Sequence, residues 1–200
     1  MAMAMAMAIM VALALFTGSG ASATSARPNP SDSPAMARWL VSQSDWGVLS
    51  TISIHLKGMP WGNVASFSDG PVGTSKGTPY FYLSKMDPTP NDIESDPRCS
   101  LSLSEAPLGS CGGVDTENPT CARLTLSGKM QEVTDTQELD FASQALFSKH
   151  PEMPDWPKGH KWVFYKLEIA DIFLIDYYGG AKPITVDEYY RGSVKAAVAR

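Results

Sequence analysis

The sequence has few cysteines and histidines and no cluster of basic residues, and each shortage excludes a class of function. Its 3 histidines, His55, His150 and His160, lie far apart, with no Cys or His three or four positions away, so no metal site is predicted. The 16 Lys and Arg residues are scattered and the net charge is −5, which excludes the basic stripe that nucleic acid attracts. Phosphate-loop, Gly-x-Ser-x-Gly and dinucleotide glycine patterns are also missing, and no catalytic residue is predicted.

The N-terminal segment contains no charge and has the pattern of a targeting peptide. The apolar stretch over residues 9–16 is shorter than the ~20 residues that cross a bilayer, so no membrane span is predicted. Small residues then offer cleavage sites around Ala21, Ala23 and Ala26. The pattern favours a secretory signal peptide over residues 1–26. A plastid or mitochondrial transit peptide is the alternative, but such peptides are Arg-rich, and the first basic residue here is Arg27.

Composition predicts one folded domain after this segment. The chain of 200 residues is 44% hydrophobic and 18% charged, which is ordinary for a globular protein. Residues 27–33 are polar and contain prolines, so we expect a flexible linker there. The domain is expected over residues 34–190, followed by a C-terminal tail over residues 191–200.

Two of the 3 cysteines bracket a segment of turn-forming residues. Cys111 and Cys121 flank the sequence GGVDTENPT, and in an oxidising compartment such a pair favours a disulfide. Cys99 alternates with leucines in CSLSL and is interpreted as a small buried apolar residue.

Short runs of β-branched and aromatic residues, separated by Gly, Pro, Asp and Asn, predict a mainly β protein. In one run, Val64, Ser66 and Ser68 fall on one face of a strand, because strand side chains alternate. Strands are expected over residues 46–54, 62–69, 78–84, 99–104, 122–133 and 161–180, the last as one long or two short strands. This succession favours a closed β-barrel with peripheral helices over an open sheet, since closure removes strand edges.

Three helices are expected around these strands. The first covers residues 33–44, where Ser33 is the N-cap and a proline follows it. The second covers residues 134–151, with a Thr or Asp cap, an apolar stripe and a proline stop. Thr185 and Glu188 have the spacing of a capping box on a last helical turn.

Five longer segments resemble one known protein family. They are SDWGVLSTIS, SFSDG, PYFYLS, LFSKHPEMPDWPKGHKW and DYYGGAKPITVDEYY. In this order they resemble the CREG family, secreted glycoproteins named as cellular repressors of E-one-A-stimulated genes. The resemblance extends over roughly residues 35–190.

The resemblance implies a homodimer with the split β-barrel of the FMN-binding, pyridoxine-phosphate-oxidase type. In flavin enzymes of this fold, the cofactor lies in a cleft at the dimer interface, and basic and hydroxyl side chains around the third strand hold its phosphate. If FMN is bound here, the candidate contacts are Ser66, Ser68, Ser84, Lys85 and Arg98.

The residues that follow the expected third strand offer few groups that could bind a phosphate. A flavin phosphate normally requires several converging Arg, Lys, Ser or Thr groups, whereas Lys85 is followed by Asp87. The resemblance further implies that the 111–121 loop projects into the cleft. The loop residues expected to occlude it are Asp115, Thr116, Glu117 and Asn118. Because the two acids repel a phosphate, we expect the scaffold to bind no cofactor, with FMN as the alternative.

The sequence contains no usable N-glycosylation site. Both Asn-x-Ser/Thr spacings, at Asn29 and Asn118, have proline in the middle position, which blocks the acceptor. The expected location is therefore the extracellular space, or a lysosome- or vacuole-like compartment reached without glycan-dependent receptors.

Two functions of different classes remain. The favoured one is a secreted or endolysosomal, non-enzymatic homodimer that binds an unidentified protein partner or receptor; control of growth and differentiation comes from the resemblance alone. The alternative is an FMN-dependent split-barrel oxidoreductase, in which the flavin supplies the redox chemistry. Haem handling ranks last, because LSKMDPTPND contains no histidine to serve as axial ligand.

Overall fold

The computed structural model describes residues 25–193 of the chain. Most of the predicted signal peptide and of the predicted tail therefore lie outside the described residues. Within this range, 4 α-helices surround a 7-stranded antiparallel sheet. None of the helices in residues 25–193 has the length and apolar character required to cross a membrane.

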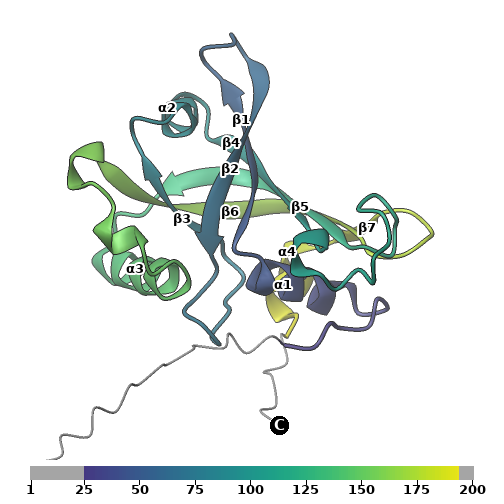
Figure 1. The fold of residues 1–200 in the computed structure, drawn as a ribbon. Coiled ribbons are helices and arrows are strands. Elements are labelled where there is room, and N and C mark those ends of the chain that lie inside the picture. Colours follow the sequence, from purple (N-terminus) through teal and green to yellow (C-terminus); the bar gives the residue numbers. More distant parts are fainter. Residues whose placement is uncertain (1–24, 194–200) are drawn as a thin grey trace, which may run out of the picture.

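The sheet closes into a barrel, because β3 pairs with β6 as well as with β2 (Figure 1). The strand order is β3-β2-β1-β4-β5-β6-β7. The bounds are β1 Trp46–Ser53, β2 Met59–Ser68, β3 Tyr80–Ser84, β4 Arg98–Ser104, β5 Arg123–Glu132, β6 Trp162–Ile175 and β7 Lys182–Ile184. The predicted mainly β fold with peripheral helices is confirmed, and the last expected strand region is one long strand with the short β7 added beyond it.

Alternation along each strand fills the barrel interior. Leu49 and Leu101 are fully buried, while their neighbours in sequence are partly or largely exposed. Phe67 is also fully buried, and here the next residue, Ser68, is buried as well. Burial of each such apolar side chain stabilises the fold by about 1.5–3 kcal/mol. Gly128 sits at the bulge between β5 and β6, where an added Cβ would lie 1.9 Å from the carbonyl oxygen of Glu168, so only glycine permits this close approach.

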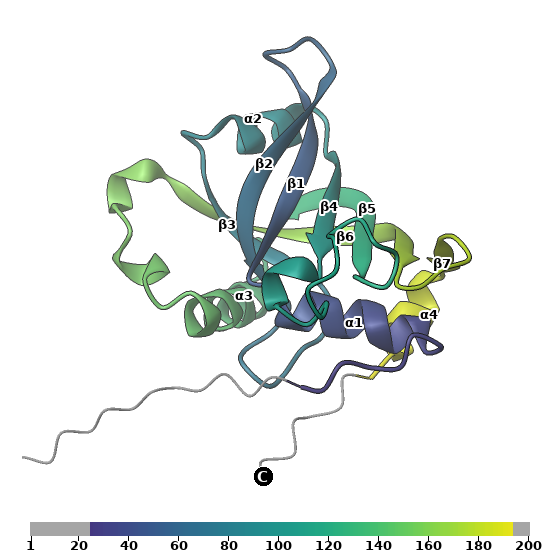
Figure 2. The same ribbon diagram turned by 45° about the vertical axis from the view of Figure 1, so that its right-hand side comes forward.

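The helices cover different parts of the barrel (Figures 1 and 2). Helices α1 and α4 pack together at one end, α2 lies at the other end, and α3 packs on β2, β3 and β6. Their bounds are α1 Ser33–Gln43, α2 Pro88–Ser95, α3 Thr136–Lys149 and α4 Val186–Arg191, with short 3-10 turns at Ala106–Leu108, Met153–Asp155 and Lys158–His160.

The predicted helix signals are largely confirmed. The Thr185–Glu188 capping box is present at α4, and Asp135 caps α3. The N-cap of α1 is Asp32, one residue before the predicted Ser33, because the Asp32 carboxylate accepts from the N–H of Ala35. Helix α2 is absent from the prediction.

The segment expected to be a flexible linker makes defined contacts with the domain. Arg27 binds Glu105, and the Lys182 ammonium donates to the carbonyl of Pro30 at 2.7 Å. Just before this segment, the Trp39 indole donates to the carbonyl of Ser25 at 3.0 Å. These partners are distant in sequence, so composition gives no sign of the contacts.

Candidate functional site

A small pocket lies at the end of β3, where the sequence predicts a flavin phosphate. Its volume is about 210 Å³. Pockets for cofactor-sized ligands usually measure about 300–1,000 Å³. The pocket of a single chain is therefore too small to hold a whole flavin. We call it the third-strand pocket, lined by Asn63, Val64, Ala65, Ser66, Tyr82, Leu83, Ser84, Asp87, Thr89, Trp156 and Trp162.

Two of the predicted cofactor contacts, Ser66 and Ser84, line this pocket together. The Ser84 hydroxyl is already engaged. Its Oγ donates to the carbonyl of His160 at 2.8 Å and accepts from the N–H of Met86 at 3.1 Å. Ser84 therefore holds the end of β3 against the chain before β6.

The other three predicted contacts lie outside the pocket. Ser68 is fully buried, and its hydroxyl donates to a nearby backbone carbonyl at 2.8 Å. The Lys85 ammonium pairs with Glu94 at 2.8 Å, and the Arg98 Nε donates to Asp96 at 2.9 Å. The hydrogen bonds from Arg98 lower the pKa of Asp96 to about 2. Both basic groups are thus neutralised by acids of α2 and of the residue that follows it.

An acid, Asp87, lies where the phosphate is expected. It caps α2, and its Oδ1 accepts from the N–H of Thr89 at 2.8 Å. The Asn63 side-chain amide lies 3.1 Å from both carboxylate oxygens. The residues present do not fit a flavin phosphate, because the pocket presents a carboxylate and no Lys or Arg lines it.

Aromatic side chains form the outer wall of the pocket. Tyr82 on β3 stacks on Trp162 of β6 with ring centroids 5.2 Å apart. Trp156, from the connection after α3, lies 4.8 Å from Trp162. These contacts hold the connection between α3 and β6 on the barrel beside the pocket.

The 111–121 loop lies elsewhere in the chain. It follows β4, whereas the third-strand pocket adjoins α2, which precedes β4 (Figure 1). Asp115, Thr116 and Glu117 are exposed, and no residue of this loop lines the pocket. Occlusion of the pocket therefore requires the loop of a second copy and stays a proposal.

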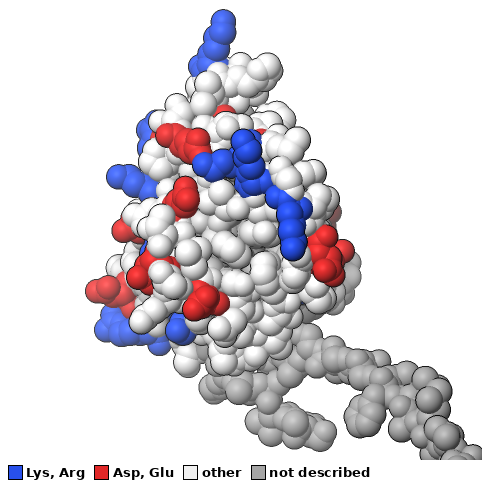
Figure 3. Space-filling view, turned by 90° about the vertical axis from the view of Figure 1, so that its left-hand side faces the viewer, with Lys and Arg blue, Asp and Glu red and all other residues white. Residues whose placement is uncertain are grey.

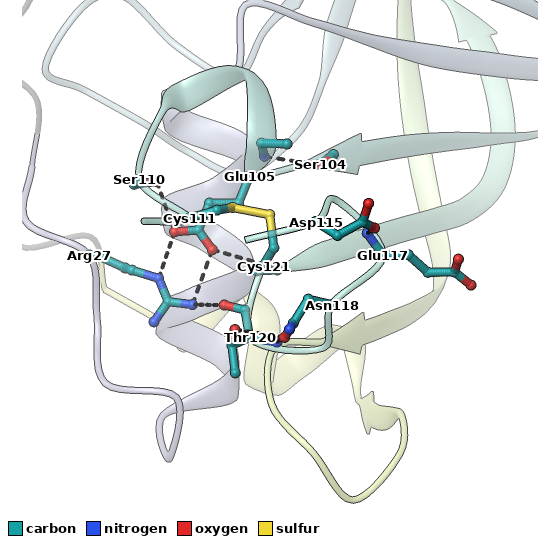
Figure 4. Close-up of a disulfide and its surroundings, with 12 residues drawn as sticks. Arg27, Ser104, Glu105, Ser110, Cys111, Asp115, Glu117, Asn118, Thr120 and Cys121 are labelled. Atoms are coloured by element: carbon teal, nitrogen blue, oxygen red, sulfur yellow. Dashed lines mark hydrogen bonds and ion pairs between the residues drawn. A yellow bond between two sulfur atoms is a disulfide. The ribbon is translucent and has the colours of Figure 1, made fainter. Parts of the chain in front are cut away.

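The base of the loop is held by a disulfide and a buried acid (Figure 4). Cys111 and Cys121 are bonded, as the spacing predicted. The fully buried Glu105 accepts from the Ser110 hydroxyl at 2.8 Å, the Ala122 N–H at 2.9 Å and the Arg27 Nε at 2.7 Å.

The pKa of Glu105 reflects these bonds. Burial acts to raise it, but the hydrogen bonds from Arg27, Ala122 and Ser110 outweigh burial, so the pKa lies below its usual value. Glu105 is therefore an ionised, fully buried carboxylate that joins the two ends of the loop to the N-terminal segment.

Replacing both Cys111 and Cys121 by alanine should loosen the loop without unfolding the barrel. Loss of the cross-link is expected to cost about 2–3 kcal/mol, while Glu105 still ties the loop base to Ala122. Limited proteolysis should then cut the loop faster. The control is Cys99→Ala, which leaves the disulfide intact, and loss of the folded barrel in the double variant would contradict this role.

The third cysteine, Cys99, is free and buried, as predicted. Burial raises the pKa of its thiol to about 12, so it is protonated and unreactive at neutral pH.

The outer surface of the barrel carries a row of apolar and hydroxyl side chains. The strand register places Val64 beside Val48, Val48 beside Ser102, Ser102 beside Thr125, and Thr125 beside Phe173. Val48, Val64 and Phe173 are exposed. We call this row, which crosses β2, β1, β4, β5 and β6, the outer sheet face.

A second pocket, of about 420 Å³, opens on this face. Its walls include Trp46, Val48, Leu108 and Thr125 together with Arg123. Within the described residues, the Arg123 Nε is buried and has no hydrogen-bond partner.

Charge and metal-ligand patterns are unremarkable in the described part of the chain. Basic and acidic side chains are interspersed on the face that carries α3 (Figure 3). Among residues 25–193, no group of three or more His, Cys, Asp or Glu could hold a metal ion.

The closed antiparallel barrel with few helices has a split β-barrel fold that solved structures share. A heme binding protein from Mycobacterium smegmatis superposes with a TM-score of 0.67 at 18% identity, covering 84% of this chain and 63% of that one. Campylobacter jejuni ChuZ gives 0.62 at 16% identity, covering 86% and 68%. At such identities the likeness shows the fold alone.

Sequence comparison identifies the family. The profile described as "CREG, beta-barrel" matches residues 28–191. Human Protein CREG1 is 40% identical over 168 residues, covering 82% of this chain and 76% of the relative. Human Protein CREG2 is 42% identical over 167 residues, covering 82% and 57%. The chain belongs to the CREG family.

Proposed function

We propose that the protein is a non-enzymatic homodimer that acts by binding another protein and holds no flavin. The observation that carries this proposal is the chemistry of the third-strand pocket. A carboxylate, Asp87, stands at the expected phosphate position, and the two basic candidates, Lys85 and Arg98, pair with acids instead. The residues of the pocket are therefore unsuited to a flavin phosphate.

The outer sheet face supports the homodimer. Exposed apolar side chains beside small hydroxyl residues, with few charges, are typical of a surface that another protein covers. The face adjoins the third-strand pocket, because Val64 belongs to both. In such a dimer, the 111–121 loop of one copy is free to reach the cleft of the other.

The proposed location is the secretory pathway, with the extracellular space or a lysosome- or vacuole-like compartment as the destination. The disulfide supports it, because disulfides persist in oxidising compartments. The family membership supports a partner or receptor that is a protein, with control of growth and differentiation as the proposed biological role.

The first test is an absorbance spectrum of the purified protein between about 350 and 500 nm, before and after addition of excess FMN and gel filtration. We expect a colourless protein that retains no flavin, because no Lys or Arg lines the pocket to pair with the phosphate. Stoichiometric flavin in the protein peak would favour the alternative, an FMN-dependent split-barrel oxidoreductase.

A further inference from the structure

The donors around Asp87 form a set that suits one anion. The carboxylate accepts from the Thr89 N–H at the start of α2 and from the Asn63 amide of β2. The Asn63 amide also lies 3.1 Å from the Thr89 hydroxyl. Backbone N–H groups at a helix start, together with side-chain amides and hydroxyls, are the groups that bind anions such as phosphate. Here the Asp87 carboxylate of the chain itself accepts the hydrogen bonds of one such N–H and one such amide, while the Thr89 hydroxyl accepts from the same amide.

The surrounding charges leave this carboxylate as the dominant charge of the pocket. Among the described residues that line the pocket, Asp87 is the one charged residue. Lys85 follows the end of β3 and Arg98 begins β4, but Glu94 and Asp96 pair with them. The potential at the pocket floor is therefore negative, which repels a second anion.

Asp87 differs from an ordinary helix cap. Asp135 also caps a helix, α3, but it is exposed, and its side chain accepts only from the N–H of Glu138. Asp87 is half-buried, lines a pocket and accepts hydrogen bonds from two elements, α2 and β2.

We propose that the Asp87 carboxylate is a built-in anion that fills the phosphate position of the third-strand pocket and excludes phosphorylated ligands. The exclusion is intrinsic to each chain and needs no loop from a second copy. It deepens the proposed function and rests on it in one respect, namely that the wild-type protein carries no flavin.

The test is a titration of Asp87→Ser with inorganic phosphate, followed by phosphorus NMR line broadening at constant ionic strength and pH 7. Serine is also a good N-cap, so α2 keeps its start while the charge and part of the volume are removed. The matched control is Asp135→Ser, the same substitution at the cap of α3. We expect Asp87→Ser to bind phosphate at least about tenfold more tightly than the wild type and the control.

Equal phosphate affinity in all three proteins would overturn the proposal, and so would a folded Asp87→Ser protein that ignores phosphate. If the serine variant does not fold, Asp87→Asn replaces it, because asparagine keeps the side-chain shape and removes the charge. We expect Asp87→Asn also to bind phosphate more tightly than the wild type. Flavin retained by the wild-type protein would sink the proposed function as well. If the wild type is colourless and Asp87→Ser does not bind phosphate, only this inference is contradicted.

Discussion

Replacing Arg27 by alanine is expected to lower the free energy of unfolding by about 3 kcal/mol at pH 7. The variant leaves Glu105, whose side chain is 0% exposed, without its cationic partner. A buried charge that loses its partner keeps its desolvation cost, so the loss exceeds the value of one hydrogen bond. Urea denaturation followed by tryptophan fluorescence measures the change.

Two further variants separate the buried charge from other effects. Glu105→Gln in the Arg27→Ala background removes the uncompensated charge, so we expect about half of the lost stability to return. Arg98→Ala breaks an ion pair whose arginine side chain is 71% exposed, and we expect almost no loss of stability, because solvent screens the pair. Equal losses for Arg27→Ala and Arg98→Ala would show that the Arg27–Glu105 pair is no more than a surface contact.

The effect of Arg27→Ala should depend on pH with a defined sign. In the wild type, the pKa of Glu105 is depressed below its unfolded value of roughly 4.3, so its stabilising contribution is present above that pH and is lost as pH falls through the folded pKa. In Arg27→Ala, burial raises the pKa instead, and protonation of Glu105 relieves the penalty. The destabilisation should therefore shrink between about pH 7 and pH 4.

The barrel and the disulfide could be predicted because their signals are local. Alternation of buried and outward residues, as around Leu101, is visible in the sequence whatever the partner strand is, and Cys111 and Cys121 flank one turn-rich segment. Helix α2 was missed because its two prolines suggest a turn. The Asp87-Pro88 pair, an N-cap followed by proline at the first helical position, was the available signal.

The candidate site was harder to predict because its chemistry depends on partners. Lys85 follows the end of β3 and Arg98 begins β4, but Glu94 and Asp96, from the segment between them, pair with both. Glu105 carries no sequence signal, since its principal partner, Arg27, is 78 positions away. A single acid in a strand-end turn is ordinarily solvated, and only the folded chain shows that this one is buried.

Val64→Glu is expected to convert the proposed homodimer into monomers, with at least about a hundredfold weaker association. Val64 is 66% exposed in the single chain, so the substitution removes little packing within it and should leave monomer stability nearly unchanged. In a dimer that covers the outer sheet face, each copy would bury a carboxylate without a partner, which costs several kcal/mol.

The matched control for this prediction is Val72→Glu. Val72 is 58% exposed but lies in the connection between β2 and β3, off the outer sheet face. Sedimentation velocity over a range of concentrations should show dimers for the wild type and for Val72→Glu, and monomers for Val64→Glu. If Val64→Glu is as dimeric as the wild type, the interface lies on another surface. A wild type that is monomeric at all concentrations would remove the homodimer from the proposal, since the outer sheet face would then stay uncovered.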